Sequence, residues 1–318
     1  MIRLFYRKQV VTGMQQFKQE GPVLFAVNHP NSFLDAILID LIAERAVYSL
    51  ARGDVFRSKL GKTILPKLNI LPVYRPSEGV ENLSQNYDTF QSCIQLFKNN
   101  QQVLIFSEGL CVQEWRLRPL KKGTARLALQ AWNEGIPLKV IPVGITYQSF
   151  RSFGKNICIN AGAAISENEL DRSNLTEGQQ NLQFNALLKD RLEPLLVDPA
   201  DPRTPPFTKF LELPIPKFKK ALLVIPGLVG WLLHAPFYYP IKRFIGRKTK
   251  GSPHYDSIML GVLVLFYFPF LLITAFLLGL FFQSYWPLAI PLVYFFTGQA
   301  YVQIKKQREF AAGNLSYK

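Results

Sequence analysis

The residues with the clearest capacity for chemistry lie in "NHPNSFLD", residues 28–35. His29 is one of three histidines in the chain, and Asp35 follows it six residues later. A carboxylate that holds one imidazole nitrogen leaves the other nitrogen to take a proton from an alcohol. A purely structural explanation also fits, because Ser32 with Asp35 three residues on is an acidic variant of the capping box at a helix start. The stretch alone leaves both explanations open.

The position of His29 depends on the elements around it. The apolar run Val23 to Val27 predicts a buried strand, and Pro30 breaks the pattern just after His29. In open α/β sheets, ligands bind beyond the carboxyl ends of the strands. The sequence therefore predicts His29 at the edge of a sheet where sites gather.

Apolar runs and helical spacing alternate up to about residue 196. Further strands are predicted at Val47–Ala51, Ile70–Tyr74, Val103–Phe106, Val140–Thr146 and Ile157–Asn160. Helices are predicted at Phe33–Ile42, around Phe90, Ile94 and Phe97, at Ala125–Trp132 and at Leu175–Leu196. Continuous apolar strands are usually covered on both faces, so we expect a layered α/β domain with a mixed sheet over residues 1–200. The proline-rich segment Val197 to Pro206 predicts the domain boundary.

Residues 201–318 differ in character from the first two thirds of the chain. Of the formal net charge of +15, residues 201–318 carry +10, from 14 basic and 4 acidic side chains. The basic clusters border apolar segments, which favours a membrane over nucleic acid as the partner. The three scattered cysteines fit a reducing compartment. Neither they nor the three separated histidines have metal-ligand spacing, so no metal site is expected.

The stretch from Ser257 to Ile304 contains no charged residue. Ile258–Phe282 and Tyr285–Ile304 are each long enough to cross a hydrocarbon core of about 30 Å as helices, so together they predict a transmembrane hairpin. Basic clusters at both outer ends, including Lys306 and Arg308, predict that both ends face the cytoplasm. A buried core hairpin of a soluble protein is the alternative explanation.

The segment Ala221–Ile241 is apolar too, but Pro226, Pro236 and Pro240 interrupt it and positive charges flank it on both sides. A single crossing would place one basic cluster on the wrong face. We therefore expect a re-entrant or interfacial element that seats the domain on the bilayer.

Five blocks occur in a fixed order along the first domain: "NHPNSFLD", "ILPVYR", "LIFSEG", "RPLKKGTARLAL" and "VIPVGITY". Together they resemble the glycerolipid acyltransferases of the 1-acylglycerol-3-phosphate acyltransferase superfamily, over residues 10 to 195. The resemblance implies transfer of a fatty acyl group from acyl-CoA or acyl-acyl carrier protein to a glycerophosphate hydroxyl. The thioester is then a donor substrate, and no bound cofactor is expected.

The resemblance also implies roles for particular residues. His29 and Asp35 match the base and its orienting partner, Arg75 matches the arginine of the second block, and Glu108 and Gly109 match the third. Where the family's third block reads F-P-E-G-T-R, this chain has "FSEGLC", so cationic help for a phosphate is expected instead from a following basic cluster. That cluster contains Arg116, Arg118, Lys121 and Lys122.

The first block departs from the family's usual form in its spacing. Five residues separate His29 from Asp35, where four are usual, and this is similar to the fungal-type glycerol-3-phosphate and dihydroxyacetone-phosphate acyltransferases. Acceptors of the first and of the second acylation both remain open. A lysophospholipid or another lipid alcohol as acceptor, and a non-catalytic lipid-binding protein of the same fold, are the alternatives.

Overall fold

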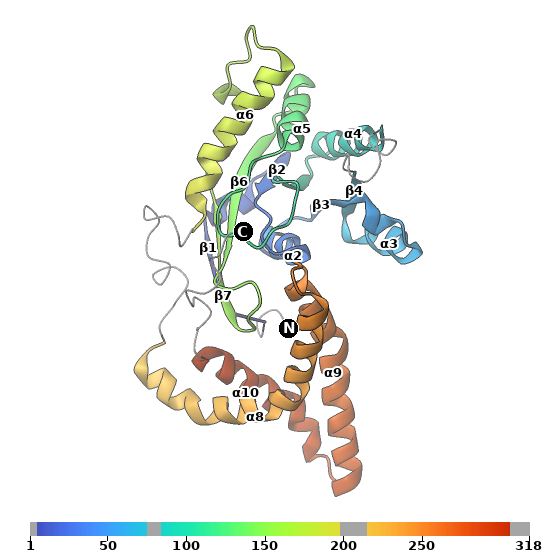
Figure 1. Ribbon diagram of the computed structural model, residues 1–318, viewed down its shortest axis with the longest axis vertical. Coiled ribbons are helices and arrows are strands. Elements are labelled where there is room, and N and C mark those ends of the chain that lie inside the picture. Colours follow the sequence, from blue (N-terminus) through green and yellow to red (C-terminus); the bar gives the residue numbers. More distant parts are fainter. Residues whose placement is uncertain (1–4, 75–83, 198–214, 306–318) are drawn as a thin grey trace. The chain divides into compact units, whose positions relative to one another are not determined.

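The computed structural model describes residues 5–74, 84–197 and 215–305 (Figure 1). The chain divides into two compact units. We call the first the α/β unit; it comprises Val11–Thr146 and Ile159–Asp198. The second, the helical unit, comprises Met1–Val10, Tyr147–Cys158 and Pro199–Lys318. The predicted boundary at Val197 to Pro206 falls almost entirely outside the described residues and stays a prediction.

The described strands form one seven-stranded sheet in the order β1-β7-β6-β2-β5-β3-β4. Its strands are β1 (Tyr6–Thr12), β2 (Val23–Val27), β3 (Val47–Arg52), β4 (Ile70–Val73), β5 (Gln102–Phe106), β6 (Lys139–Tyr147) and β7 (Lys155–Ala161). β2 pairs in parallel with both β5 and β6, and β3 pairs in parallel with β4 and β5. The carboxyl ends of these central strands therefore meet at one edge of the sheet.

Helices follow most strands of the α/β unit. They are α2 (Phe33–Ile42), α3 (Lys59–Ile64), α4 (Ser84–Lys98), α5 (Lys122–Asn133) and α6 (Glu177–Leu192). Short 3₁₀ turns lie at Met14–Lys18, Gly53–Phe56, Pro66–Leu68, Glu167–Glu169 and Glu193–Leu195. Figure 1 shows α5 and α6 lying side by side next to the sheet.

The core of this unit holds β2 between two packed layers. All five β2 residues are buried, and Leu24 and Ala26 join a cluster with side chains from α4, α5 and α6. Side chains alternate along a strand, so Phe25 points to the opposite face, where its ring stacks on Phe17 with centroids 5.6 Å apart. A strand buried on both faces is rigid, which suits it to position the residues that follow.

The predicted α/β fold class is confirmed, with C-terminal helices after the sheet domain. The strand Val23–Val27 and the helix Phe33–Ile42 have the predicted bounds. β1 was not predicted, because three polar residues follow Tyr6 in "YRKQVVT" and leave only a short apolar stretch. Its place in the sheet comes from tertiary pairing and not from local pattern.

The helical unit contains α8 (Lys217–Lys248), α9 (Tyr255–Phe282), a 3₁₀ turn at Trp286–Ala289 and α10 (Ile290–Ile304). Among the described residues, α8 and α9 are long and apolar enough to cross a membrane, by length and composition alone. The segment 221–241 lies inside the single helix α8, despite its three prolines. The segment 285–304 is divided, and α10 has 15 residues.

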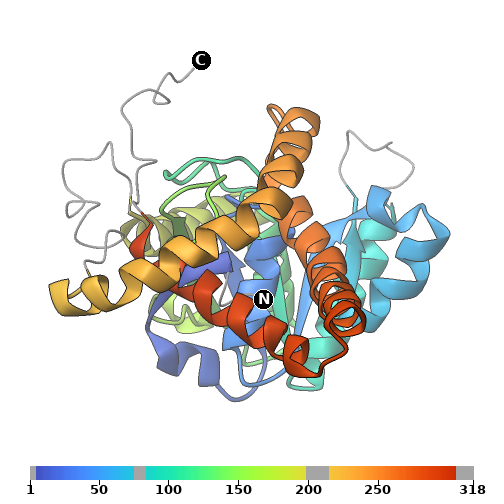
Figure 2. The same cartoon turned by 90° about the horizontal axis from the view of Figure 1, so that it is seen from below.

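Two features hold the helical unit together. α8 and α10 lie side by side (Figure 2), and a Cβ added at Gly230 of α8 would lie 2.1 Å from the Thr297 carbonyl oxygen of α10. Small residues let helix backbones approach this closely. The second feature is an ion pair between Lys155, at the start of β7, and Asp256, in the first turn of α9; each side chain is only 1% exposed.

Candidate active site

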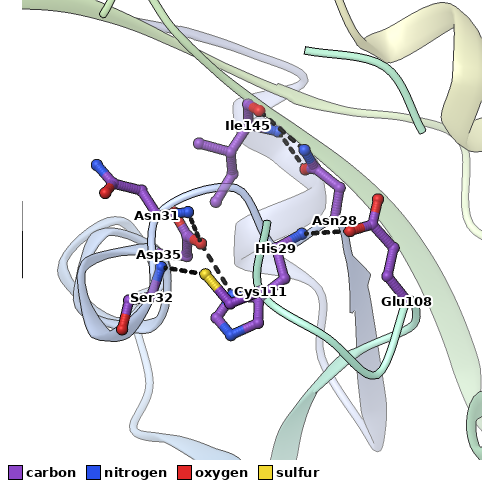
Figure 3. Close-up of polar contacts among 8 residues, drawn as sticks. All are labelled: Asn28, His29, Asn31, Ser32, Asp35, Glu108, Cys111 and Ile145. Atoms are coloured by element: carbon purple, nitrogen blue, oxygen red, sulfur yellow. Dashed lines mark hydrogen bonds and ion pairs between the residues drawn. The ribbon is translucent and has the colours of Figure 1, made fainter. Parts of the chain in front are cut away.

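The end of β2 is clamped to β6 just before His29. The Asn28 side-chain amide donates to the Ile145 carbonyl at 3.0 Å, and its oxygen accepts from the Ile145 N–H at 2.7 Å (Figure 3). Both groups are buried. These two hydrogen bonds fix the backbone where the chain leaves the sheet, and so fix the position of His29.

His29 and Asp35 form a hydrogen-bonded pair. The His29 Nδ1 atom lies 2.9 Å from Asp35 Oδ2, the Asp35 side chain is 0% exposed and the His29 side chain is 16% exposed. Because a carboxylate only accepts hydrogen bonds, Nδ1 carries the proton and Nε2 is left with its lone pair. The pair therefore has the form of a base with an orienting partner, as in the first explanation of the sequence.

Two further contacts fix this pair. Asp35 Oδ2 also accepts the Asn31 N–H at 2.8 Å, which holds the carboxylate in place. The His29 ring stacks on Phe106, the last residue of β5, with centroids 3.7 Å apart and planes at 13°. The plane of the imidazole is thus set by packing, and its tautomer is set by the carboxylate.

The capping explanation holds only in part: Asp35 lies in the first turn of α2, but the Ser32 side chain does not cap the helix. Ser32 is the N-cap of α2 but makes no side-chain capping bond, and its backbone has φ 58° and ψ −140°, which is strained for a residue other than glycine. Asp35 Oδ2 bonds to His29 and Asn31 instead. The Ser32 N–H donates to Cys111 Sγ at 3.0 Å.

Glu108 reaches the same place from β5. The register pairs Val27 of β2 with Phe106 of β5, so the residues that follow these two strands lie together. Glu108 Oε2 accepts the His29 N–H at 3.3 Å, and Oε1 accepts the Arg118 N–H at 3.1 Å. The carboxyl group, on a residue only 4% exposed, joins the ends of β2 and β5 to the loop that leads to α5.

The environment of Glu108 changes its acidity. Burial raises the pKa of Glu108 to about 7, and the N–H groups of Arg118 and His29 act in the opposite direction. A carboxyl group whose pKa is raised on folding stabilises the folded state at low pH. That contribution is lost as the pH rises from about 4.5 through about 7.

This linkage gives a stability prediction. As the pH rises from 5 to 8, the thermal midpoint of the wild type is expected to decrease relative to that of Glu108→Gln, which cannot ionise. The corresponding difference in unfolding free energy is on the order of 1 to 3 kcal/mol. Thermal unfolding of both proteins in the same detergent, across this pH range, measures it. Midpoints that change in parallel would show that Glu108 is not protonated on folding.

Gly109 follows Glu108 with φ 62°, a left-handed conformation that side chains other than glycine rarely adopt. A Cβ there would also lie 2.9 Å from Lys121 Cγ. The Gly109 N–H donates to the Phe106 carbonyl at 3.0 Å, which closes the turn that presents Glu108. Glycine at this position thus serves the geometry of the turn.

The basic cluster lies on the loop between β5 and α5. Arg118 Nη1 bonds Glu114 Oε1 at 3.0 Å, and Arg116 Nε lies 3.7 Å from Glu114 Oε2. One carboxylate therefore holds two guanidinium groups, both with substantial exposure. The Lys121 N–H donates to the Ser107 carbonyl at 2.8 Å, and its side chain is exposed.

Residues 8–146 match the family model described as Acyltransferase. This part of the chain belongs to the acyltransferase family. The predicted resemblance to the glycerolipid acyltransferase superfamily is thereby confirmed. Among solved structures, the chain is similar to the 1-acyl-sn-glycerophosphate (LPA) acyltransferase PlsC from Thermotoga maritima. That match has 16% sequence identity and a TM-score of 0.43, over 59% of this chain and 69% of the other. A comparison with curated proteins found no significant match.

The acyltransferase domain brings together some of the predicted site residues. His29, Asp35 and Glu108 are joined by hydrogen bonds, and Arg118 is joined to Glu108 through its backbone. Gly109 and Lys121 lie next to each other beside this group, and Arg116 is linked to it through Glu114. Arg75 lies outside the described residues. The catalytic and binding roles of all these residues stay predictions.

Asn31, Phe106 and Cys111 contact the candidate site but were not predicted. Phe106 was recognised only as the end of a strand, and Cys111 only as a departure from the third block. The parallel pairing of β2 with β5 is the feature that would have placed Phe106 beside His29. No local pattern indicates that Cys111 reaches the Ser32 N–H across 79 residues of sequence.

Proposed function

We propose that the chain is an acyltransferase that moves a fatty acyl group from a thioester to a hydroxyl of glycerol-3-phosphate or 1-acylglycerol-3-phosphate. The observation that carries this proposal is the His29–Asp35 pair, held at 2.9 Å within an acyltransferase domain. The donor is acyl-CoA or acyl-acyl carrier protein, used as a substrate, and no bound cofactor takes part.

In the proposed reaction, His29 Nε2 takes the proton of the acceptor hydroxyl as its oxygen attacks the thioester carbonyl. The tetrahedral intermediate then collapses, the carbon–sulfur bond breaks, and the proton passes from Nε2 to the leaving thiolate. Asp35 stabilises the imidazolium formed between these two steps. The ester and the free thiol are the products, so the residues return to their starting state.

The acceptor's phosphate requires cationic donors. Arg116, Arg118 and Lys121 are assigned this role because they lie on the loop that Glu108 ties to His29. Arginine suits phosphate because its planar fork donates two parallel hydrogen bonds. Arg75 is proposed as a further donor on the basis of the family resemblance alone.

The acyltransferase is proposed to be an integral membrane protein with its catalytic domain on the cytoplasmic side. α9 is long and apolar enough to cross a bilayer, and basic residues precede it in the sequence. This placement brings a soluble thioester and an amphipathic acceptor to one surface, and the product stays in the lipid. Phospholipid is then a constant partner of the protein.

The proposed topology predicts that positions 283 and 305 lie on opposite sides of the membrane. Single cysteines at these positions, Gln283→Cys and Lys305→Cys, are treated with a membrane-impermeant thiol reagent in intact and in permeabilised cells. Position 305 is expected to react only after permeabilisation, and position 283 before it. Reaction of both positions from the same side would contradict the hairpin.

The proposed reaction is tested by an assay of the purified full chain in detergent. Glycerol-3-phosphate, dihydroxyacetone phosphate, 1-acylglycerol-3-phosphate and a lysophospholipid are each paired with acyl-CoA and with acyl-acyl carrier protein. Formation of an ester that depends on donor and acceptor, and is largest with a glycerophosphate, is the expected result. An ester formed only with the lysophospholipid would change the acceptor. Folded protein that makes no ester with any pair would favour a non-catalytic lipid-binding protein.

A further inference from the structure

The helical unit contains a cavity that the proposed acyl transfer does not use. Its volume is about 160 Å³, and side chains of α8, α9 and α10, with Phe153, line it. Tyr267 and Val302 are buried in its wall, whereas Trp231 and Tyr239 are about half exposed. A cavity of similar size in another protein, lined by apolar side chains, holds a benzene ring, so this one has room for a short segment of an acyl chain.

The polar groups in the wall are satisfied by each other. His234 Nδ1 lies 2.7 Å from the Gly230 carbonyl oxygen, and Nε2 lies 2.6 Å from the Tyr267 hydroxyl. Because a carbonyl only accepts, Nδ1 carries the hydrogen and Nε2 accepts from the tyrosine hydroxyl. The Trp231 indole N–H donates to the Tyr239 hydroxyl at 3.3 Å. The wall therefore presents mainly aromatic surface to an occupant.

Two lysines also line this cavity, Lys242 of α8 and Lys305 just after α10. Lys305 Nζ donates to the Phe153 carbonyl at 2.9 Å, which holds the ammonium group at the cavity. Within the described residues of the helical unit, Asp256 is the only acidic residue, and it is buried in its ion pair with Lys155. The two lysines therefore give the cavity a positive charge.

We propose that this cavity binds an anionic phospholipid of the surrounding membrane. The headgroup phosphate lies at Lys242 and Lys305, and the first part of one acyl chain enters the aromatic cavity. Charge complementarity selects an anionic headgroup, and basic pockets between membrane helices bind such headgroups. Tyrosine and tryptophan side chains, apolar with one polar end, suit the boundary between headgroup and acyl chain.

The binding test uses Trp231 as the reporter and requires no acyl donor. The purified full chain in a neutral detergent is titrated with dihexanoyl phosphatidylglycerol, with dihexanoyl phosphatidylcholine and with inorganic phosphate. The fluorescence of Trp231→Phe is subtracted at each point. The anionic lipid is expected to bind at least about tenfold more tightly than the other two. Equal binding of the two lipids, or of phosphate alone, would overturn the proposal.

Charge-matched variants locate the site. Lys242→Gln with Lys305→Gln is expected to weaken binding of the anionic lipid at least about tenfold. Lys219→Gln with Lys220→Gln removes the same charge from the first turn of α8 and is expected to change it less than about twofold. Ala235→Phe, which fills the cavity and adds no tryptophan, is expected to abolish binding. Equal losses in the two lysine pairs, or wild-type binding by Ala235→Phe, would overturn the assignment.

Lipid binding and acyl transfer can be separated. His29→Ala, which the proposed function makes inactive, is expected to bind the anionic lipid as the wild type does. A wild type that transfers acyl groups but shows no preference for the anionic lipid would remove this proposal and leave the proposed function standing. Loss of lipid binding in His29→Ala would contradict a site formed by the helical unit alone.

Discussion

Replacement of His29 by alanine is expected to lower kcat by about 10²- to 10⁴-fold, because a positioned general base contributes an acceleration of this size. The same factor corresponds to about 2.7 to 5.4 kcal/mol of transition-state stabilisation. KM for the acceptor should change little, since the basic loop residues and not the imidazole are assigned to its phosphate. Steady-state rates with the best donor and acceptor pair measure both constants.

A matched histidine variant controls for the substitution itself. His254 is exposed and lies at the start of α9 in the helical unit, so His254→Ala should keep kcat within about twofold of the wild type. The thermal midpoint of His29→Ala is measured in parallel to show that it is folded. If folded His29→Ala kept more than a tenth of the wild-type kcat, His29 would not be the base.

The second large effect is expected from Asp35→Asn. The Asp35 carboxylate accepts from both His29 Nδ1 and the Asn31 N–H, and only its oxygen fixes the hydrogen on Nδ1. An amide carries no charge, so it stabilises the imidazolium formed during the reaction less than the carboxylate does. A fall in kcat of about 10²- to 10⁴-fold is expected, by analogy with the same change in a serine protease triad.

Kinetic measurements distinguish a positioning role of Asp35 from a role in folding alone. Asp35→Asn should lower kcat with little change in KM for the acceptor, and should alter the pH dependence of kcat. Asn31 provides the control, because its backbone N–H bonds the carboxylate; Asn31→Ala keeps that bond and should keep most of the activity. An Asp35→Asn enzyme with a wild-type pH profile, and a loss that only follows its lower stability, would contradict the positioning role.

Local sequence patterns were sufficient for the elements that carry the site. Val23 to Val27 is continuously apolar and its strand is buried on both faces, so hydrophobicity alone identified it. The spacing in Phe33 to Ile42 identified α2 in the same way. His29 could be placed at a strand end because Pro30 follows it, and prolines rarely continue a strand.

The contacts that complete the site depend on tertiary structure. Glu108 lies beside His29 because the parallel register pairs Val27 with Phe106. The sequence of either strand alone does not determine this register. The predicted side-chain cap by Ser32 was wrong for a related reason, although Asp35 does lie in the first turn of α2. Asp35 Oδ2 is bound to His29 and Asn31, and Ser32 adopts a positive φ that its residue type does not predict.

The central claim is that His29 and Asp35 act as one unit in acyl transfer. The direct test is the kcat of wild type, His29→Ala, Asp35→Asn and the double variant, measured with one donor and acceptor pair. Residues that act as a unit give strongly non-additive losses. The double variant is predicted to be no slower than the slower single variant, within about threefold. A double variant whose loss is the product of the two single losses would contradict the claim.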